Sequence, residues 1–301
     1  MSENLSTGKT YGGSSVGGGP THQETVADVD VVKIAPVPAE QLVEETMPDL
    51  SVFDTLTVER AQAIIARYPQ SRSALLPMLH LVQSVEGRVS QAGIHFCAAQ
   101  LDLTPAEVSA VATFYTMYKR KTCGEHLVSV CTNTLCAVLG GDDIYKKLGE
   151  HLGSDGKKVG HNETAGEPGT PGSITLEHAE CLAACDLGPV VQVNYEFYDN
   201  QTVDSAVALV DALRAGERPA PTRGAPLRDF RTAELELAGF FPDDAAEYAA
   251  GVDGPSAAVE TLRGAQLANE RGWVAPAMPD TVRLPSEKKP ADSTDVAVTK
   301  K

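Results

Sequence analysis

Two pairs of cysteines are the residues of this chain whose type and spacing are best suited to chemistry. Cys131 and Cys136 lie in CTNTLC, separated by four residues, and Cys181 and Cys185 lie in CLAAC, separated by three. Each pair follows a β-like run, LVSV before the first and SITLEHA before the second. Loops that follow neighbouring strands can meet at one edge of a sheet. We therefore predict that the four thiols converge on one centre.

Composition and spacing reduce the chemistries open to these cysteines from four to two. Six cysteines in 301 residues are too few for a disulfide scaffold, and a reducing cytosol disfavours disulfides. A thioredoxin-type dithiol uses C-x-x-C, which neither pair has. Structural zinc accepts four thiolates, and a 2Fe–2S cluster takes two on each iron. The wide spacers and nearby small residues favour the cluster, but spacing alone leaves zinc open.

The remaining cysteines and the nearby histidines are not expected to be ligands. Cys97 and Cys123 lack a paired partner, and free cysteine is commonly a small buried hydrophobe. A Rieske centre replaces two cysteines by histidines, but His126 and His178 lack the interleaved spacing and are expected to be ordinary strand residues. Asp186 either lowers the reduction potential of a neighbouring cluster or is a solvated loop carboxylate.

The elements that must position the cysteines change type along the chain. Residues 56–118 have a helical pattern, with the best-defined helix start at LTPAEV. There Thr104 is an N-cap, Pro105 takes the first helical position and Glu107 completes a capping box, and the apolar stripe that follows extends to Tyr115. After these helices the order is β-α-loop-β-β-α, with HLVSVC, SITLEHAE and PVVQVNYEF as the β-like runs. This order predicts a small α/β sandwich.

These patterns divide the chain into four parts. They are a disordered acidic and Gly-rich arm (1–53), a helical bundle (54–122), an α/β domain (123–217) and an extended C-terminal tail (218–301). The bundle, the RGAPL segment and the tail are the candidates for docking on a partner.

Composition also excludes several classes of function. The formal net charge of −16 argues against sequence-independent nucleic-acid binding and against attachment to anionic lipid. No apolar segment approaches the roughly 20 residues that span a bilayer. The N-terminal residues lack a secretory signal or a transit peptide, so we expect a cytoplasmic protein without direct membrane insertion. Gly8-Lys9-Thr10 lacks the upstream glycine and strand of a P-loop and is interpreted as a chance match.

Five segments in a fixed order carry a resemblance to a known family. They are YPQSRSALLPMLHLVQ, AEVSAVATFYTMYKRK, VSVCTNTLCAVLGG, ECLAACDLGPVVQVN and RGAPL, and together they fall within residues 55–240. On these segments the chain resembles the small iron–sulfur subunit of bacterial NADH:quinone oxidoreductase, the respiratory complex I. The resemblance implies an α+β fold, with an N-terminal helical bundle followed by a thioredoxin-like ferredoxin domain.

The resemblance also implies a cofactor, ligands and partners. It implies one 2Fe–2S cluster, rather than zinc, on Cys131, Cys136, Cys181 and Cys185. It places FMN and NADH in a partner subunit only, from which the cluster accepts single electrons, with the large iron–sulfur subunit beside it. The chain would then have no catalytic site of its own and would lie at the inner face of the plasma membrane through the proton-translocating complex.

Three points remain open at this stage. The same subunit could serve an NAD-linked hydrogenase or formate dehydrogenase, and a structural-zinc binding module is the alternative from another class. The second cysteine motif of the family often has glycine where this chain has Ala183. A methyl group there is expected to be tolerated unless the position requires a positive φ.

Overall fold

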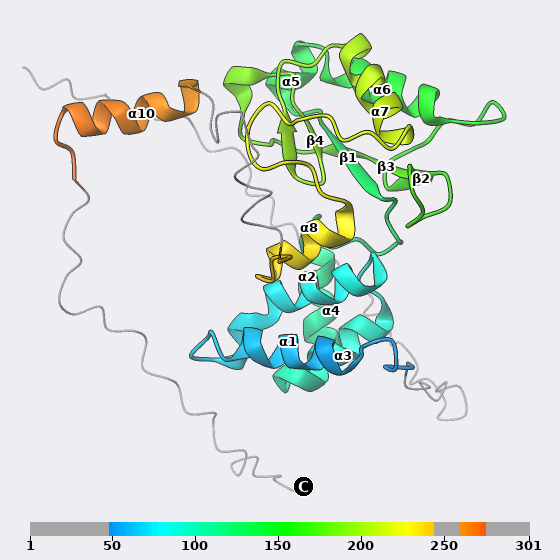
Figure 1. The fold of residues 1–301 in the computed structure, drawn as a ribbon, viewed down its shortest axis with the longest axis vertical. Helices are drawn as coiled ribbons and strands as arrows, with labels where there is room; N and C mark the ends of the chain where they lie inside the picture. The colour runs from blue at the N-terminus through cyan, green and yellow to red at the C-terminus, as the bar shows by residue number, and fades with distance from the viewer. Residues whose placement is uncertain (1–47, 244–258, 275–301) are drawn as a thin grey trace, which may run out of the picture. The chain divides into compact units, whose positions relative to one another are not determined.

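The computed structural model describes residues 48–243 and 259–274 (Figure 1). The predicted N-terminal arm up to residue 47, with Gly8-Lys9-Thr10, lies outside the described residues, as do segments 244–258 and 275–301 of the predicted tail. In the described ranges, no helix is long and apolar enough to cross a membrane.

The first part of the described chain is the predicted helical bundle. Its elements are α1 (Thr55–Ile65), the short 3-10 helix η2 (Ser71–Ala74), α2 (Leu75–Glu86), α3 (Gln91–Leu101) and α4 (Pro105–Phe114). Their apolar faces share one core, in which Ile64, Met78 and Leu79 are fully buried. Pro77 lies in the first turn of α2, where its missing N–H breaks no helical hydrogen bond.

Helix α4 begins as the sequence predicts and ends earlier. Thr104 Oγ1 accepts a hydrogen bond from the Glu107 N–H (3.3 Å), and Glu107 Oε2 accepts one from the Thr104 N–H (3.0 Å). Both halves of the capping box are therefore present, with Pro105 at the first helical position. The prediction that the apolar stripe reaches Tyr115 is wrong, because Tyr115 is extended and its ring packs edge-on against Phe114.

A mixed sheet with helices against it forms the second part. Its elements are β1 (His126–Cys131), α5 (Thr134–Val138), α6 (Gly141–Leu152), β2 (Glu163–Ala165), β3 (Ile174–Ala179), η3 (Cys185–Leu187), β4 (Val191–Val193), β5 (Glu196–Tyr198) and α7 (Val203–Arg214). The strand order is β2-β3-β1-β4-β5. Only the central pair β1 and β3 is parallel among the strand pairs of the described residues.

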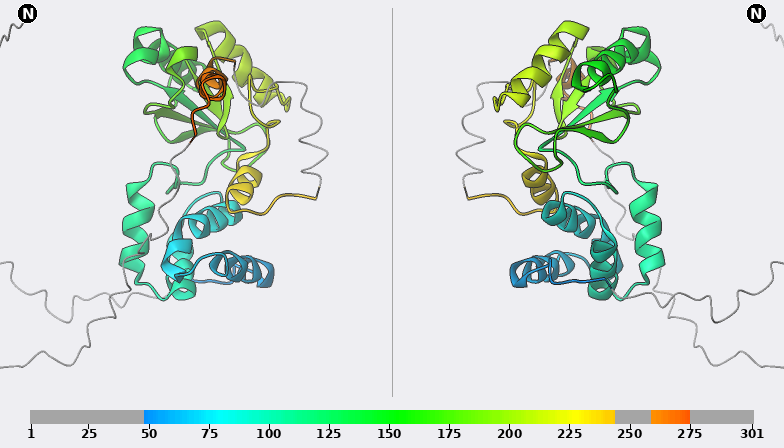
Figure 2. Two further views of the ribbon diagram at one scale, coloured as in Figure 1. Left: turned by 90° about the vertical axis from the view of Figure 1, so that its left-hand side faces the viewer. Right: turned by 90° about the vertical axis from the view of Figure 1, so that its right-hand side faces the viewer.

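The two faces of the sheet have different neighbours. Val128 and Val130 of β1 pack into the core formed with α6 and α7, which lie on one side of the sheet (Figure 2). Leu127 packs with Cys123 and Phe230 instead, because successive strand residues point to opposite faces. The parallel pair at the centre is thus covered on both faces, as parallel strands generally are.

Two strand features escape the sequence pattern. Strand β2 lies in the segment predicted to be a Gly/Pro loop, and its three residues are too few to show alternation. The single predicted run PVVQVNYEF is in fact the hairpin of β4 and β5, with Asn194 and Tyr195 as its two turn residues at φ 47° and 74°. A two-residue hairpin turn of this kind favours Asn followed by Gly. Because Tyr195 takes the place of the glycine, the sequence pattern does not reveal the turn.

Part of the predicted extended tail is helical and packs on the chain itself. Helix α8 (Phe230–Leu237) begins at Asp229, whose side chain accepts a hydrogen bond from the Thr232 N–H (3.0 Å). It packs against α2, and Phe230 is completely buried. Helix α10 (Val259–Glu270) is also described. The predicted partner docking of residues 218–301 stays a prediction.

Candidate iron–sulfur centre

The parallel pairing of β1 and β3 brings the two cysteine loops together. Cys131 at the end of β1 is in register with Ala179 at the end of β3, so both loops leave the same edge of the sheet. The N–H of Thr132 donates to the Ala179 carbonyl (3.0 Å). The Asn133 amide donates to Glu180 Oε2 (3.0 Å), which links the two loops beyond the strand ends.

The first pair is buried. Cys131 and Cys136 are 2% and 3% exposed, and the N–H of Cys131 donates to the Val190 carbonyl (3.0 Å). The backbone packs closely around them: a Cβ on Gly141 would lie 2.4 Å from the Cys131 carbonyl oxygen. A Cβ on Gly188 would lie 3.2 Å from Cys136 Sγ. Glycine at 188 therefore leaves room beside the Cys136 thiol, and glycine at 141 lets the backbone approach that of Cys131 closely.

The second pair is exposed, and its two sulfur atoms are close. Cys181 Sγ lies 3.8 Å from Cys185 Sγ, and the N–H of Ala183 donates to Cys181 Sγ (3.4 Å). Ala183 has φ 57°, in the left-handed region that favours glycine. This position therefore does have a positive φ, so the methyl group of Ala183 is expected to strain the backbone here.

Two of the thiols, those of Cys136 and Cys185, have raised pKa values that favour their neutral forms. Burial raises the pKa of Cys136 to about 11, with a smaller contribution from the neighbouring Cys131. The pKa of Cys185 is raised, chiefly because its thiol shares a hydrogen bond with Cys181. A metal bound here must displace these protons, because thiolates are the ligands.

The geometry of the second pair suits two ligands of one metal ion. Two thiolates about 2.3 Å from a tetrahedral metal lie about 3.8 Å apart, which is the separation of the second pair. Two pairs, one buried and one exposed, match a cluster that takes two thiolates on each iron.

The other candidate residues lie elsewhere. Cys97 is fully buried in the bundle core, and burial raises its pKa. Cys123 is buried against Leu127, and burial raises its pKa to about 12. His126 lies in β1 and His178 lies in β3. The ring of His178 packs against the ring of His161.

An exposed apolar patch beside the first pair was missed by the sequence analysis. Leu135, Val138 and Leu139 are 46%, 79% and 52% exposed, and they surround Cys136 in the chain. The signal was the apolar content of TLCAVLGG, which a buried short helix would equally explain. We call these three residues the α5 patch.

The fold and the cysteine centre define a class of protein, and comparison with known proteins agrees with it. The chain belongs to the family of thioredoxin-like [2Fe-2S] ferredoxins, whose model matches residues 61–214. Within that class it groups with the E subunits of NADH-quinone oxidoreductases, as the resemblance of its motifs predicted.

The relatives cover most of the described fold. The E subunit of the Mycobacterium tuberculosis NADH-quinone oxidoreductase is 52% identical over 253 residues, which is 82% of this chain and 94% of that protein. Its counterpart in Rickettsia bellii is 36% identical over 165 residues, 54% of this chain and 93% of that protein. An H2-reduced NAD+-reducing [NiFe]-hydrogenase structure has a TM-score of 0.40 at 15% identity, with 47% of this chain and 22% of that chain covered.

Proposed function

We propose that this chain holds one 2Fe–2S cluster on Cys131, Cys136, Cys181 and Cys185 in the NADH dehydrogenase module of respiratory complex I. In this proposal it accepts single electrons from the FMN of a flavin- and NADH-binding partner subunit and has no catalytic site of its own. The large iron–sulfur subunit lies beside that partner. The chain then lies at the cytoplasmic face of the plasma membrane through the complex.

The observation that carries the proposal is the convergence of two cysteine pairs at one edge of the sheet. The register of Cys131 with Ala179 places the two loops side by side. The 3.8 Å separation of Cys181 Sγ and Cys185 Sγ suits two ligands of one tetrahedral iron. Two such pairs supply the four thiolates of a 2Fe–2S cluster, two on each iron.

The asymmetry of the site supports transfer to a partner. A bound 2Fe–2S cluster supplies one-electron exchange. The chain buries the Cys131 side, which keeps water from that half, and leaves Cys181 and Cys185 at the surface. The residues of the α5 patch surround Cys136 in the chain, and exposed apolar residues beside a functional centre are typical of a protein interface.

The proposal is tested by the iron–sulfur content of the purified full chain and of its complex. Cys181→Ser should remove the rhombic S = 1/2 EPR signal that dithionite reduction produces in the unsubstituted chain. Cys97→Ala, which changes a cysteine of the bundle core, should retain that signal. A Cys181→Ser complex with its full set of EPR signals would show that the ligand assignment is wrong. A colourless, zinc-containing protein without acid-labile sulfide would support the zinc-module alternative.

A further inference from the structure

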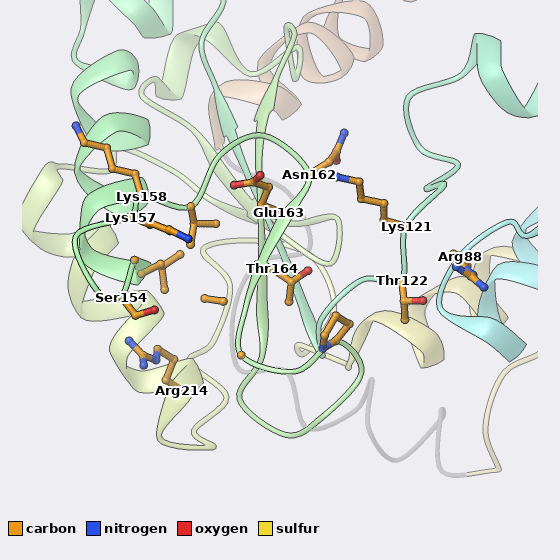
Figure 3. A pocket seen from close by; sticks show the side chains of 16 residues that line it. Arg88, Lys121, Thr122, Ser154, Lys157, Lys158, Asn162, Glu163, Thr164 and Arg214 are labelled. Atoms are coloured by element: carbon orange, nitrogen blue, oxygen red, sulfur yellow. The ribbon is translucent and has the colours of Figure 1, made fainter.

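A polar cavity lies away from the cysteine centre, on the side of the molecule formed by β2 and the loops around it (Figure 3). Its volume is about 650 Å³. One wall is the α6–β2 loop with the end of α7, and the other is the turn after α2 with the segment that follows the bundle. The cavity therefore has walls from both the bundle side and the sheet side.

Five cationic side chains line this cavity. They are Arg88, Lys121, Lys157, Lys158 and Arg214. Lys158 Nζ lies 2.6 Å from Glu150 Oε1, but the other four form no ion pair with any residue that the structure describes. The chain has 41 acidic and 25 basic residues. With carboxylates in excess, most cationic side chains would be expected to have a carboxylate partner, and these four do not.

The remaining lining residues supply hydrogen-bond donors and little negative charge. Thr122 and Ser154 contribute hydroxyl groups, whereas the Thr164 hydroxyl is hydrogen-bonded to that of Thr175 (2.7 Å). Glu163 is the single carboxylate among the described lining residues, and its Oε2 accepts a hydrogen bond from the Gly160 N–H (2.8 Å). Unpaired cations with neutral donors form a lining that selects an anion.

The placement of the cations indicates an anion with more than one charge. In Figure 3 the side chains of Lys121 and Lys157 extend into the space from opposite sides. A monovalent anion at one wall would leave the other wall unneutralised. None of the lining residues that the structure describes is aromatic, so the cavity offers no surface on which a nucleobase would stack.

We propose that this cavity binds a small, soluble, multivalent phosphate of the diphosphate class. Lys and Arg both bind phosphate oxygens through charge-assisted hydrogen bonds, and Arg does so with two parallel donors. An anion bound between the two walls would contact Lys121 in the segment after the bundle and Lys157 in the α6–β2 loop, and would thereby link these two segments. Because the ligand binds the folded chain, it raises the free energy of unfolding as its concentration rises above the dissociation constant.

The test is calorimetric titration of the cluster-containing full chain with pyrophosphate at fixed ionic strength. Lys121→Gln/Lys157→Gln should weaken pyrophosphate binding about tenfold or more, since each lysine lost removes a charge-assisted hydrogen bond to a phosphate oxygen. Lys146→Gln/Lys147→Gln is the matched control: it makes the same change in net charge at two exposed lysines of α6 outside the cavity. That variant should bind pyrophosphate as the unsubstituted chain does.

Three results would overturn the proposal. The first is equal pyrophosphate affinity in the two double variants, or no binding by the unsubstituted chain. The second is binding of a hexaglutamate peptide as tight as that of pyrophosphate, which would indicate an acidic protein segment as the occupant. The third is Lys121- and Lys157-dependent sedimentation with phosphatidylglycerol vesicles in the absence of pyrophosphate binding, which would indicate a lipid headgroup.

Discussion

Replacing Lys119 by methionine should destabilise the chain strongly, because it leaves a buried carboxylate without its cation. Lys119 and Glu177 are 4% and 8% exposed, and Lys119 Nζ lies 2.5 Å from Glu177 Oε1. The second oxygen of Glu177 accepts a hydrogen bond from Ser129 Oγ (2.7 Å). Lys119 belongs to the segment that joins the bundle to β1, and its N–H donates to Gln83 Oε1 of α2 (2.6 Å).

The expected magnitude follows from this burial. Breaking a buried ion pair by removing one partner costs about 3–5 kcal/mol, whereas replacing both partners with apolar residues is often close to neutral. Ser129 still donates to Glu177 in Lys119→Met, so we expect the lower end, about 3 kcal/mol. Lys119→Met/Glu177→Leu removes both charges. It should therefore be more stable than either single variant.

Urea unfolding of the full chain, followed by far-ultraviolet circular dichroism at matched cluster content, measures these differences. The matched control is Lys158→Met, which breaks the exposed pair with Glu150, whose side chains are 61% and 40% exposed. Exposed pairs contribute about 0–1 kcal/mol, so this variant should change the free energy of unfolding little. The reasoning is refuted if Lys119→Met costs no more than Lys158→Met. It is also refuted if the double variant is less stable than both single variants.

Two further predictions concern a strained residue and a titrating one. Ala183→Gly should slow cluster loss to a chelator, followed by visible absorbance, because it removes a left-handed alanine that costs about 1–2 kcal/mol. Ala184→Gly, at φ −124°, should not slow it, and equal rates in the two variants would contradict the strain argument. Burial raises the pKa of Glu196 from 4.5 to about 7, so the stability it contributes is present below pH 4.5 and lost as pH rises through 7. Glu196→Gln should flatten the fall in unfolding free energy between these pH values, and an unchanged slope would show that Glu196 does not cause it.

Much of the fold could be predicted from local sequence because its signals are local. The start of α4 is determined by three residues in four positions, Thr104, Pro105 and Glu107, and all three act as predicted. Helix α6 has its apolar residues, such as Ile144 and Leu148, at helical spacing and fully buried. In each case the interaction that determines the element lies within one or two turns of the chain.

The missed elements depend on contacts between distant residues. Strand β2 exists because Thr164 pairs with Thr175 of β3, and three residues carry no period of their own. Helix α8 is tied to the bundle by Glu234, whose Oε2 lies 2.6 Å from His80 Nδ1. Its other oxygen accepts a hydrogen bond from Tyr195 Oη (2.6 Å), so one buried carboxylate joins α8 to α2 and to the β4–β5 turn. A glutamate in a short helix looks like a surface residue until its partners are known.

The cysteine centre shows the same division between local and distant determinants. Spacing could group four cysteines into two pairs, because each pair lies within one loop. Spacing could not distinguish zinc from a binuclear cluster, since that depends on how the loop after β1 meets the loop after β3. The register of Cys131 with Ala179 determines how the two loops lie beside each other. In this arrangement the first pair is buried and the second pair is exposed. The α5 patch surrounds Cys136 in the chain, so a partner that covers the patch would approach the cysteine centre from the α5 side.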